Sequence, residues 1–518
     1  MTWQPEIDDL KRRLELAQEM GGPENVARHH AGGKLTIRER IERLVDADSF
    51  AETGALAGKP EYDEAGNLVS IRPANFVMGL ARIDGRRVVI GGDDFTVRGG
   101  AADASIGGKQ GYAELMAREL RLPIVRLVDG TGGGGSVRSL DSMGRTYVPA
   151  NPAWDTIIGM LDEVPVISAA MGSVAGLGAA RVVTCHWNIM VNDTSQVFVA
   201  GPPVVSRGMG EEVTKEELGG AQIHYHNGVC DNLAEDEDDA FRQIRQFLSY
   251  MPQNAWQQPR RAEPSDDPQR RDDWLLSAIP RNRRRPYKVR EIIRAVVDRD
   301  SFFEIGAGWG RTVVTGLARL DGYPVGIISN DAYEYGGGLT ADGSEKMERM
   351  VDLCNSFHIP AVNFLDQPGF VIGTAGEKAA TIRKGARAMT AVFQAQVPWV
   401  TILMRRAFGV AGAAHANTGR LNLRYAWPSG DWGSLPLEGG IEAAYKRDLA
   451  AAEDPDALRA ELEAKFNAVR SPFRTAEAFG IEHIIDPRDT RPILCDWVEL
   501  AYELESTQLG PRLHGYRP

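Results

Sequence analysis

Residues 164–180 read VPVISAAMGSVAGLGAA, and residues 397–413, VPWVTILMRRAFGVAGA, repeat the pattern without a gap. The alignment places Gly176 opposite Gly409. Each copy begins with a short apolar run bounded by proline, which is typical of a buried strand, and continues into a run rich in small residues. We interpret each copy as a strand that leads into a Gly- and Ala-rich helix.

The glycines between strand and helix indicate a possible chemistry. The first N–H groups of a helix have no partner within the helix and lie at the positive end of its dipole. Glycine lets a ligand oxygen approach them closely, so they can stabilise a carbonyl oxygen that becomes negative during a reaction. One such run alone would more simply serve tight helix packing. Two copies in matching context favour two oxyanion holes made of backbone amides.

The repeat extends over most of the chain. Segments 44–54, 79–85, 93–100 and 122–134 (LVDADSFAETG, GLARIDG, DDFTVRGG and LPIVRLVDGTGGG) return in the same order as segments 296–306, 316–322, 330–337 and 359–370 (VVDRDSFFEIG, GLARLDG, NDAYEYGG and IPAVNFLDQPGF). Repetition in order indicates a duplicated domain. Apolar strands alternate with helical runs such as 112–120 and 341–358, which predicts α/β domains with right-handed crossovers.

A segment rich in Pro, Gln and charged residues separates the two copies. Such a composition is typical of a linker or an extended strap. We therefore predict an N-terminal domain at residues 1–255, a linker at 256–287 and a C-terminal domain at 288–518.

Composition narrows the class of protein. A chain of 518 residues with 43% hydrophobic and 25% charged residues is expected to form two large globular domains. Its net charge of −12 argues against general nucleic-acid binding and against anionic membrane surfaces. The N-terminus lacks the features of a targeting segment, and the four cysteines lie far apart without a CxxC pair. We therefore expect a cytoplasmic protein with reduced thiols.

The common side-chain motifs of catalysis are missing from the sequence. The nine histidines include no HExxH or other metal-ligand spacing, so we predict no metal site. There is no GxSxG motif, and the glycine run 132–135 lacks the GK[ST] ending of a phosphate loop. Backbone catalysis by two amide holes therefore fits the sequence best.

Beyond these patterns, the chain resembles the carboxyltransferase β subunits of biotin-dependent acyl-CoA carboxylases, such as propionyl-CoA and methylcrotonoyl-CoA carboxylase. The resemblance runs from residues 32–54 to residues 478–494. The motifs that carry it are DDFTVRGG (93–100), GPPVV (201–205), EELGGAQIHYHNGVCDNLAEDEDDA (216–240), DQPGF (366–370), YAWP (425–428) and EGG (438–440).

The resemblance implies two tandem crotonase-like α/β domains of the ββα-superhelix type. It also implies a homohexamer whose active sites form between the N-terminal half of one subunit and the C-terminal half of another. In this family a biotin on a separate carrier domain delivers the carboxyl group, which the enolate of an acyl-CoA thioester accepts. The chain has no AMKM-type biotinylation site and no ATP-grasp signature. It is therefore expected to need a biotin carboxylase and a biotin carboxyl carrier subunit as partners.

The resemblance also assigns residues. Gly176 and Leu177 match the amide pair that serves the thioester, and Val410 and Ala411 match the pair that serves the ureido group of biotin. To substrate binding we assign Gly132, Gly133, Gly134, Ala413, Arg406 and Lys109. To biotin binding we assign Gly409, Asp366, Gly369 and Phe370. For Asp366 a helix cap, and for Arg406 and Lys109 a surface salt bridge, are competing interpretations.

The chain departs from the family at both holes. Related enzymes commonly have Gly-Gly where this chain has Gly176-Leu177 and Gly409-Val410. Propionyl-type enzymes carry an acidic residue where this chain has Ala413. We therefore expect an acyl group other than simply propionyl, with Ala413 opening room for a larger or branched chain and Leu177 or Val410 removing some.

Other functions stay open at this point. One is a biotin-dependent decarboxylase or transcarboxylase with the same fold, and another is a catalytically silent subunit that supports assembly. A crotonase-type hydratase would need a pair of carboxylates that the sequence does not place.

Overall fold

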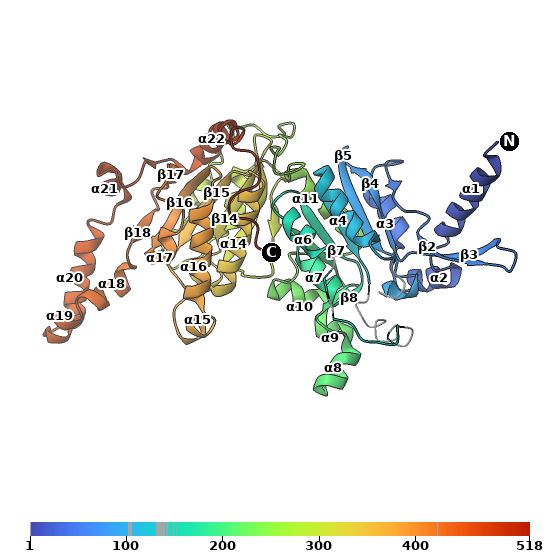
Figure 1. Ribbon diagram of the computed structural model, residues 1–518. Helices are drawn as coiled ribbons and strands as arrows, with labels where there is room; N and C mark the ends of the chain where they lie inside the picture. The colour runs from blue at the N-terminus through green and yellow to red at the C-terminus, as the bar shows by residue number, and fades with distance from the viewer. Residues whose placement is uncertain are drawn as a thin grey trace. The chain divides into compact units, whose positions relative to one another are not determined.

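The computed structural model describes residues 2–101, 106–130, 140, 143–148, 150–151, 153–421 and 423–518. By its internal contacts the chain divides into two compact units (Figure 1). Unit 1 comprises the residues up to Gln257 together with Pro518, and unit 2 comprises Gln258–Arg517.

Unit 1 is built on one main sheet with the strand order β1-β4-β5-β6-β7-β9-β11. The first three strands are antiparallel and the remaining pairs are parallel. These strands are β1 Ala51–Glu52, β4 Phe76–Ile83, β5 Arg86–Asp93, β6 Ile124–Val128, β7 Val166–Ala170, β9 Trp187–Val191 and β11 Asn232–Ala234. Two small sheets pair β2 Gly58–Tyr62 with β3 Leu68–Pro73 and β8 Ser173–Ala175 with β10 Gln196–Phe198.

Unit 2 repeats this sheet strand by strand, in the order β12-β13-β14-β15-β16-β17-β19. Its first three strands are again antiparallel and the following ones parallel. The strands are β12 Phe303–Ile305, β13 Val313–Leu320, β14 Tyr323–Asn330, β15 Ala361–Gln367, β16 Trp399–Phe408, β17 Leu423–Ala426, β18 Asp431–Gly433, which also pairs with β16, and β19 His483–Ile484. The predicted duplication of an α/β domain is confirmed.

The helices lie before, between and after the strands along the chain (Figure 1). In unit 1 they are α1 Gln4–Gln18, α2 Pro23–Ala31, α3 Ile37–Leu44, α4 Lys109–Leu120, α6 Trp154–Met160, α7 Leu177–Val183, α8 Pro202–Met209, α9 Lys215–Gly219, α10 Ala221–Asn227 and α11 Glu237–Tyr250. In unit 2 they are α12 Leu275–Ala278, α13 Val289–Val296, α14 Ala341–Ser356, α15 Thr374–Lys378, α16 Thr381–Gln394, α17 Gly409–Ala413, α18 Leu437–Ala444, α19 Lys446–Ala451, α20 Pro455–Asn467, α21 Pro472–Glu477 and α22 Thr490–Glu505. The helical runs expected near 112–120 and 341–358 are α4 and α14.

Local sequence explains the first hairpin of each sheet. The β4–β5 turn consists of Asp84 and Gly85, which both have positive φ values of 49° and 75°. The turn between β13 and β14 repeats them as Asp321 and Gly322, with φ values of 48° and 80°. Asp-Gly is the sequence that favours this two-residue turn, whose twist matches that of the strands.

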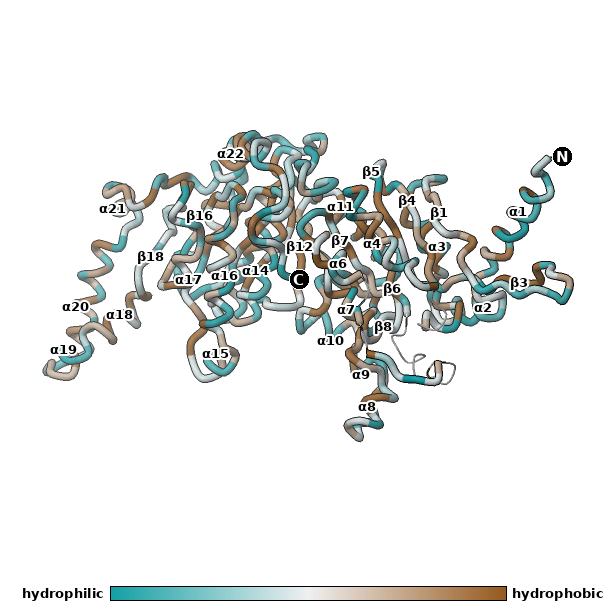
Figure 2. The backbone as a smooth tube through the Cα atoms, in the orientation of Figure 1, coloured by the Kyte–Doolittle hydropathy of each residue, from teal (hydrophilic) through white to brown (hydrophobic). Residues whose placement is uncertain are grey.

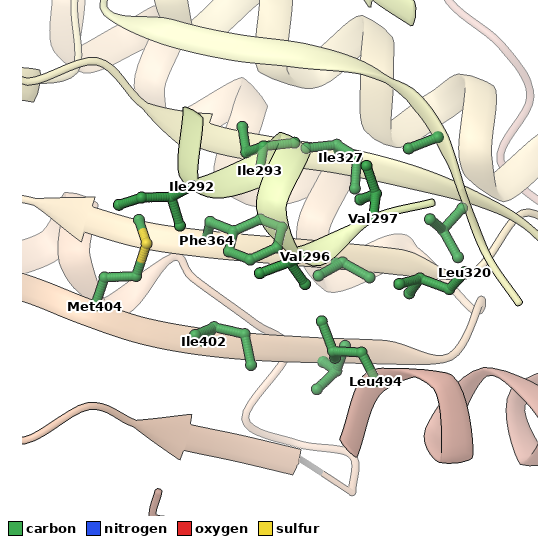
Figure 3. Packing of buried hydrophobic residues seen from close by; sticks show 14 of the residues in the cluster. Ile292, Ile293, Val296, Val297, Leu320, Ile327, Phe364, Ile402, Met404 and Leu494 are labelled. Atoms are coloured by element: carbon green, nitrogen blue, oxygen red, sulfur yellow. The ribbon is translucent and has the colours of Figure 1, made fainter. Parts of the chain in front are cut away.

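The core of unit 2 lies between its sheet and the helices α13 and α22. β-Branched and aromatic side chains from neighbouring parallel strands meet helix residues there without contact with water, which is the dominant source of stability for such a layer. Figure 3 shows this packing, with Ile292, Ile293, Val296, Val297, Leu320, Ile327, Phe364, Ile402, Met404 and Leu494 labelled.

Helix α3 in unit 1 shows how a charged helix still packs. Its N-cap Thr36 and the third helical residue, Glu39, form a reciprocal capping box. Ile37, Ile41 and Leu44 are buried along one face. By contrast, α1 is mostly exposed and hydrophilic (Figure 2).

No helix of the described residues is both long and apolar enough to cross a membrane.

The two copies of the strand-to-helix unit differ in one respect. In unit 2, β16 runs up to Phe408 and α17 begins at Gly409. In unit 1, β7 ends at Ala170, and β8 intervenes before α7. The expectation of a helix directly after the strand was therefore wrong for unit 1. A Cβ at Gly172, which follows β7, would lie 2.0 Å from Asp129 Oδ1, so the chain turns there beside a buried carboxylate.

Candidate active site

In unit 1 the amide end of α7 is set by Gly176. This residue has φ 62° and ψ −124°, a conformation that glycine adopts without a Cβ clash. Its N–H donates to the Phe198 carbonyl over 3.2 Å, because β8 and β10 pair at this point. The N–H groups of Leu177 and Gly178 are then the first two of the helix. The Leu177 side chain is 37% exposed.

Unit 2 also has a glycine with a positive φ at the aligned place, as the first residue of α17. Gly409 has φ 60°, and a Cβ there would lie 3.4 Å from the Ser434 carbonyl oxygen. The next two residues are Val410, whose side chain is 53% exposed, and the buried Ala411. Their N–H groups are the second and third of α17, which begins at Gly409, whereas those of Leu177 and Gly178 are the first two of α7.

The assigned pairs are thus offset by one residue. Gly176 and Gly409 occupy the same position, so the counterparts of Val410 and Ala411 are Leu177 and Gly178. The hydrogen bond of Gly176 to Phe198 favours the same choice, since it occupies the Gly176 N–H. Ala413 is exposed at the end of α17, and Gly132, Gly133 and Gly134 lie outside the described residues.

A buried ionic cluster holds α7 in place against the sheet. Glu114 accepts from Arg126 Nε and Nη2 over 3.0 and 2.9 Å and also pairs with Arg181 of α7. Arg126 Nη1 donates to the carbonyls of Arg181 and Thr184 at the end of the helix, over 3.0 and 2.8 Å. The three charged side chains are almost completely buried, so the cluster fixes the helix against the sheet.

Asp129 directly follows β6 and belongs to a second buried cluster. Arg40 Nη1 lies 2.9 Å from Asp129 Oδ2, and Lys34 Nζ lies 3.4 Å from Oδ1. The backbone N–H of Asp129 donates to Asp93 Oδ2 over 3.2 Å. Burial raises the pKa of Asp93 to about 6. Asp93 is therefore a carboxyl group that titrates just below neutral pH, beside Asp129 and Gly130.

Asp366 is the counterpart of Asp129 in unit 2, and its side chain is fully buried. Arg405 Nη2 and Arg406 Nε donate to it over 2.8 and 2.6 Å, and the Tyr287 hydroxyl donates over 3.0 Å. Burial would raise the pKa of Asp366, but the hydrogen bonds and charges of the two arginines outweigh it, so this pKa lies below its usual value. The carboxylate therefore positions two arginines instead of facing a cavity.

The remaining residues assigned from the sequence lie around these clusters. Arg406 is half-buried and donates from Nη2 to the Gly336 carbonyl over 2.5 Å. Gly369 has φ 125° and accepts from the Leu339 N–H over 2.9 Å. The Phe370 ring packs on α16, where a Cβ at Gly385 would meet it at 2.2 Å.

Lys109 begins α4 and is half-buried, and its pKa is lowered by burial. Within the described part of the chain it has no hydrogen bond from its ammonium group. Its counterpart, Lys346, donates to the carbonyls of Trp309 and Val313 over 3.1 and 2.7 Å. Lys109 is thus the one of the two lysines that a ligand can engage.

Sequence reasoning missed several residues that shape these sites. Tyr287, Arg40 and the Glu114 cluster join parts of the chain that are far apart, and no local motif marks them. His415 follows α17, but its buried ring bonds through Nδ1 to the Gly412 carbonyl over 2.7 Å. No group of three or more His, Cys, Asp or Glu side chains that could hold a metal ion occurs among the described residues.

Comparison with known proteins connects this architecture to a family. The family model of the carboxyl transferase domain matches residues 28–516. The carboxyltransferase subunit of propionyl-CoA carboxylase from Haloferax mediterranei is 34% identical over 95% of both chains. Methylmalonyl-CoA decarboxylase subunit alpha from Veillonella parvula is 32% identical over 100% of this chain and 99% of its own.

Comparison with solved structures points to the same family. A crystal structure of transcarboxylase 12S with methylmalonyl-coenzyme A and methylmalonic acid bound, described as a hexamer assembly, matches with a TM-score of 0.87 and 29% identity. The match covers 100% of this chain and 98% of that one. From the matched domain, the relatives and the duplicated crotonase-like fold, we conclude that the chain belongs to the carboxyl transferase domain family, that of the carboxyltransferase subunits of biotin-dependent acyl-CoA carboxylases.

Proposed function

We propose that this protein transfers a carboxyl group from a biotin carried by a partner subunit to the α- or vinylogous carbon of an acyl-CoA. The observation that carries the proposal is the left-handed glycine that opens a helix at the same place in both units, Gly176 and Gly409. Two carbonyl oxygens become negative in such a transfer, and two sets of amide N–H groups are suited to them.

In unit 1, Leu177 and Gly178 would donate to the thioester oxygen as this oxygen becomes negative. Because these donors are fixed by the chain, they need no reorganisation when negative charge develops, and they act most strongly on the enolate. Lys109 has a free ammonium group among the described residues and would attract a phosphate of CoA. Gly132, Gly133 and Gly134 are likewise proposed to bind the acyl-CoA substrate.

In unit 2, Val410 and Ala411 would donate to the ureido oxygen of biotin. The residues fit this group, because the glycine before them lacks a side chain and their N–H groups lie at the start of a helix. The bound biotin supplies the carboxyl group. Arg406, held by Asp366, would offer positive charge beside Gly336, while Gly369 and Phe370 would shape the neighbouring loop.

Assembly and acyl specificity are part of the proposal. We infer a homohexamer from the likeness to transcarboxylase 12S, and a biotin carboxylase and carrier subunit as partners. We infer an acyl chain that is larger or more branched than propionyl from the exposed Ala413. A cytoplasmic location fits the four cysteines, which are free and buried thiols.

A second function, decarboxylation or transfer to a keto acid, is favoured by the relatives named methylmalonyl-CoA decarboxylase and transcarboxylase 12S. The test is reconstitution with a biotin carboxylase and carrier subunit, ATP and bicarbonate, with a panel of acyl-CoAs of increasing length and branching. ATP-dependent carboxylation of at least one acyl-CoA is expected. Transfer only to keto acids would support the second function, and no exchange with any acyl chain would support a silent subunit.

A further inference from the structure

Unit 2 contains a cavity of about 470 Å³ that the proposed reaction does not use. It lies between α12, the segment 279–283, the loop after β17 and the residues between α20 and α21. This volume is in the range of small-molecule sites. One wall is apolar, with Leu275, Ile279 and Trp427 among its residues.

Arginines make this cavity positive. Arg281, Arg283, Arg405 and Arg470 line it. Two carboxylates face these four guanidinium groups, and each is shared. Asp431 accepts from Arg283 Nη1 over 2.8 Å and from Arg470 Nε over 2.6 Å. Asp366 is divided between Arg405 and Arg406.

An excess of positive charge therefore remains at the cavity. Arg281 is exposed and has no ion pair within the described residues. The chain as a whole carries a net charge of −12, so the cluster does not merely follow from the composition. Positive charge gathered in a concave, partly apolar site attracts anions more strongly than the same charge on a convex surface.

The arginine-rich segment is also held in place. Arg405 is 4% exposed, and its Nη1 donates to the carbonyls of Arg283 and Arg285 over 3.4 and 3.0 Å. The Arg283 side chain is 49% exposed, and its buried partner Asp431 has a second ion pair with Arg470. Arg283 can therefore turn from Asp431 to an incoming anion without disturbing the backbone.

We propose that this cavity binds an organic phosphate, such as a phosphate or diphosphate ester. Guanidinium groups bind phosphate oxygens in a bidentate manner, and Arg281 with Arg283 would supply this contact. The apolar wall would hold the organic part. Such a ligand has two sources, a free nucleotide and the nucleotide end of CoA. The proposal does not depend on the carboxyl transfer proposed above.

The test is equilibrium binding to the full-length protein at constant ionic strength, with ADP, CoA and inorganic pyrophosphate as probes. Wild type is expected to bind ADP saturably. The double variant Arg281→Gln/Arg283→Gln is expected to bind about tenfold or more weakly, since two charged hydrogen-bond donors are lost. The matched control is Arg284→Gln, an exposed arginine of the same segment that does not line the cavity, and its affinity is expected to stay within about twofold of wild type.

The arms of the experiment separate the sources. If CoA displaces ADP and its own binding weakens in the double variant, the ligand is the nucleotide end of CoA. If CoA does not displace ADP, the ligand is a free nucleotide. No saturable binding of ADP or CoA, pyrophosphate bound as tightly as ADP, or equal losses in the double variant and the control would overturn the proposal. Arg281→Gln alone breaks no described ion pair, so it keeps the test valid if the double variant misfolds.

Discussion

A glycine with a positive φ lies at the start of both α7 and α17, but the two helices are anchored by different chemistry. Behind α7 stands the ionic cluster of Glu114, Arg126 and Arg181. Neutral hydrogen-bonding groups anchor α17. Asn363 Nδ2 donates to the His415 carbonyl over 3.0 Å, and Trp399 Nε1 donates to the same oxygen over 2.9 Å.

The difference between the two anchors can be traced to aligned positions in the sequence. Arg126 of β6 corresponds to Asn363 of β15. The duplicated units thus share the glycine and the exposed helix start, while the side chains that support them differ. The shared part of the machinery is main chain, which is what an amide oxyanion hole requires.

The largest expected effect is on the ionic anchor. Glu114→Gln leaves Arg126 and Arg181 buried without a carboxylate, so unit 1 should lose about 3–5 kcal/mol of unfolding free energy. Asn363→Ala in unit 2 removes one neutral hydrogen bond and should cost about 1–3 kcal/mol. Urea unfolding of both variants measures whether Glu114→Gln loses more unfolding free energy than Asn363→Ala. Equal losses would contradict the distinction between the two anchors.

Next in size are the two glycines. An Ala at Gly176 or Gly409 must adopt a positive φ, which strains the start of the helix and displaces its amides. We expect about a 100-fold loss of rate for each, measured as decarboxylation of a malonyl-type CoA with free biotin. Gly176→Ala should raise mainly the KM for the acyl-CoA. Gly409→Ala should raise mainly the KM for biotin.

The control for the glycine variants is Gly66→Ala. Gly66 also has a positive φ, of 82°, but lies in the β2–β3 hairpin with open space around its Cα. Its rate should stay within about twofold of wild type, since only the local strain is common to the three variants. A 100-fold loss in this control would show that the assay reports folding alone.

A smaller effect is expected at Asp93, whose counterpart in unit 2 is Asn330. The folded pKa of about 6 lies above the ordinary value of 3.8, so the folded state holds a proton that the unfolded state releases between about pH 4 and pH 6. The unfolding free energy should therefore fall as pH rises through this window and stay low above it.

Asp93→Asn should remove that pH dependence and stabilise unit 1 by on the order of 1–2 kcal/mol at pH 7, with little change at pH 4. Asn can still accept the backbone N–H of Asp129, as Asn330 accepts that of Asp366 over 3.2 Å. Urea unfolding at several pH values measures it. A constant difference across pH would mean that Asp93 is not the titrating group.

The smallest effect is expected at Ala413. Ala413→Asp adds bulk and negative charge at the exposed end of α17 and should shift preference toward shorter acyl groups by several-fold, or about 1 kcal/mol. The ratio of kcat/KM values over an acyl-CoA panel measures it. An unchanged profile would remove Ala413 from the acyl site. Ala180→Asp, at the aligned position of unit 1, is the matched comparison.

Much of this architecture could be predicted from the sequence, because the duplication shows which residues correspond. The Asp-Gly turns, the glycines before α7 and α17 and the alternation of strands and helices are local patterns. The ionic anchor could not be predicted, since Glu114, Arg126 and Arg181 meet only after three crossovers bring them together. The strand β8 was missed because the turn at Gly172 depends on the distant Asp129.

The most direct test of the two-hole account is a crystal structure with a thioester analogue of the acyl-CoA. The account predicts that the thioester oxygen lies about 2.7–3.1 Å from the backbone nitrogens of Leu177 and Gly178. An oxygen held instead by side chains, with both amide groups facing away from it, would contradict the account.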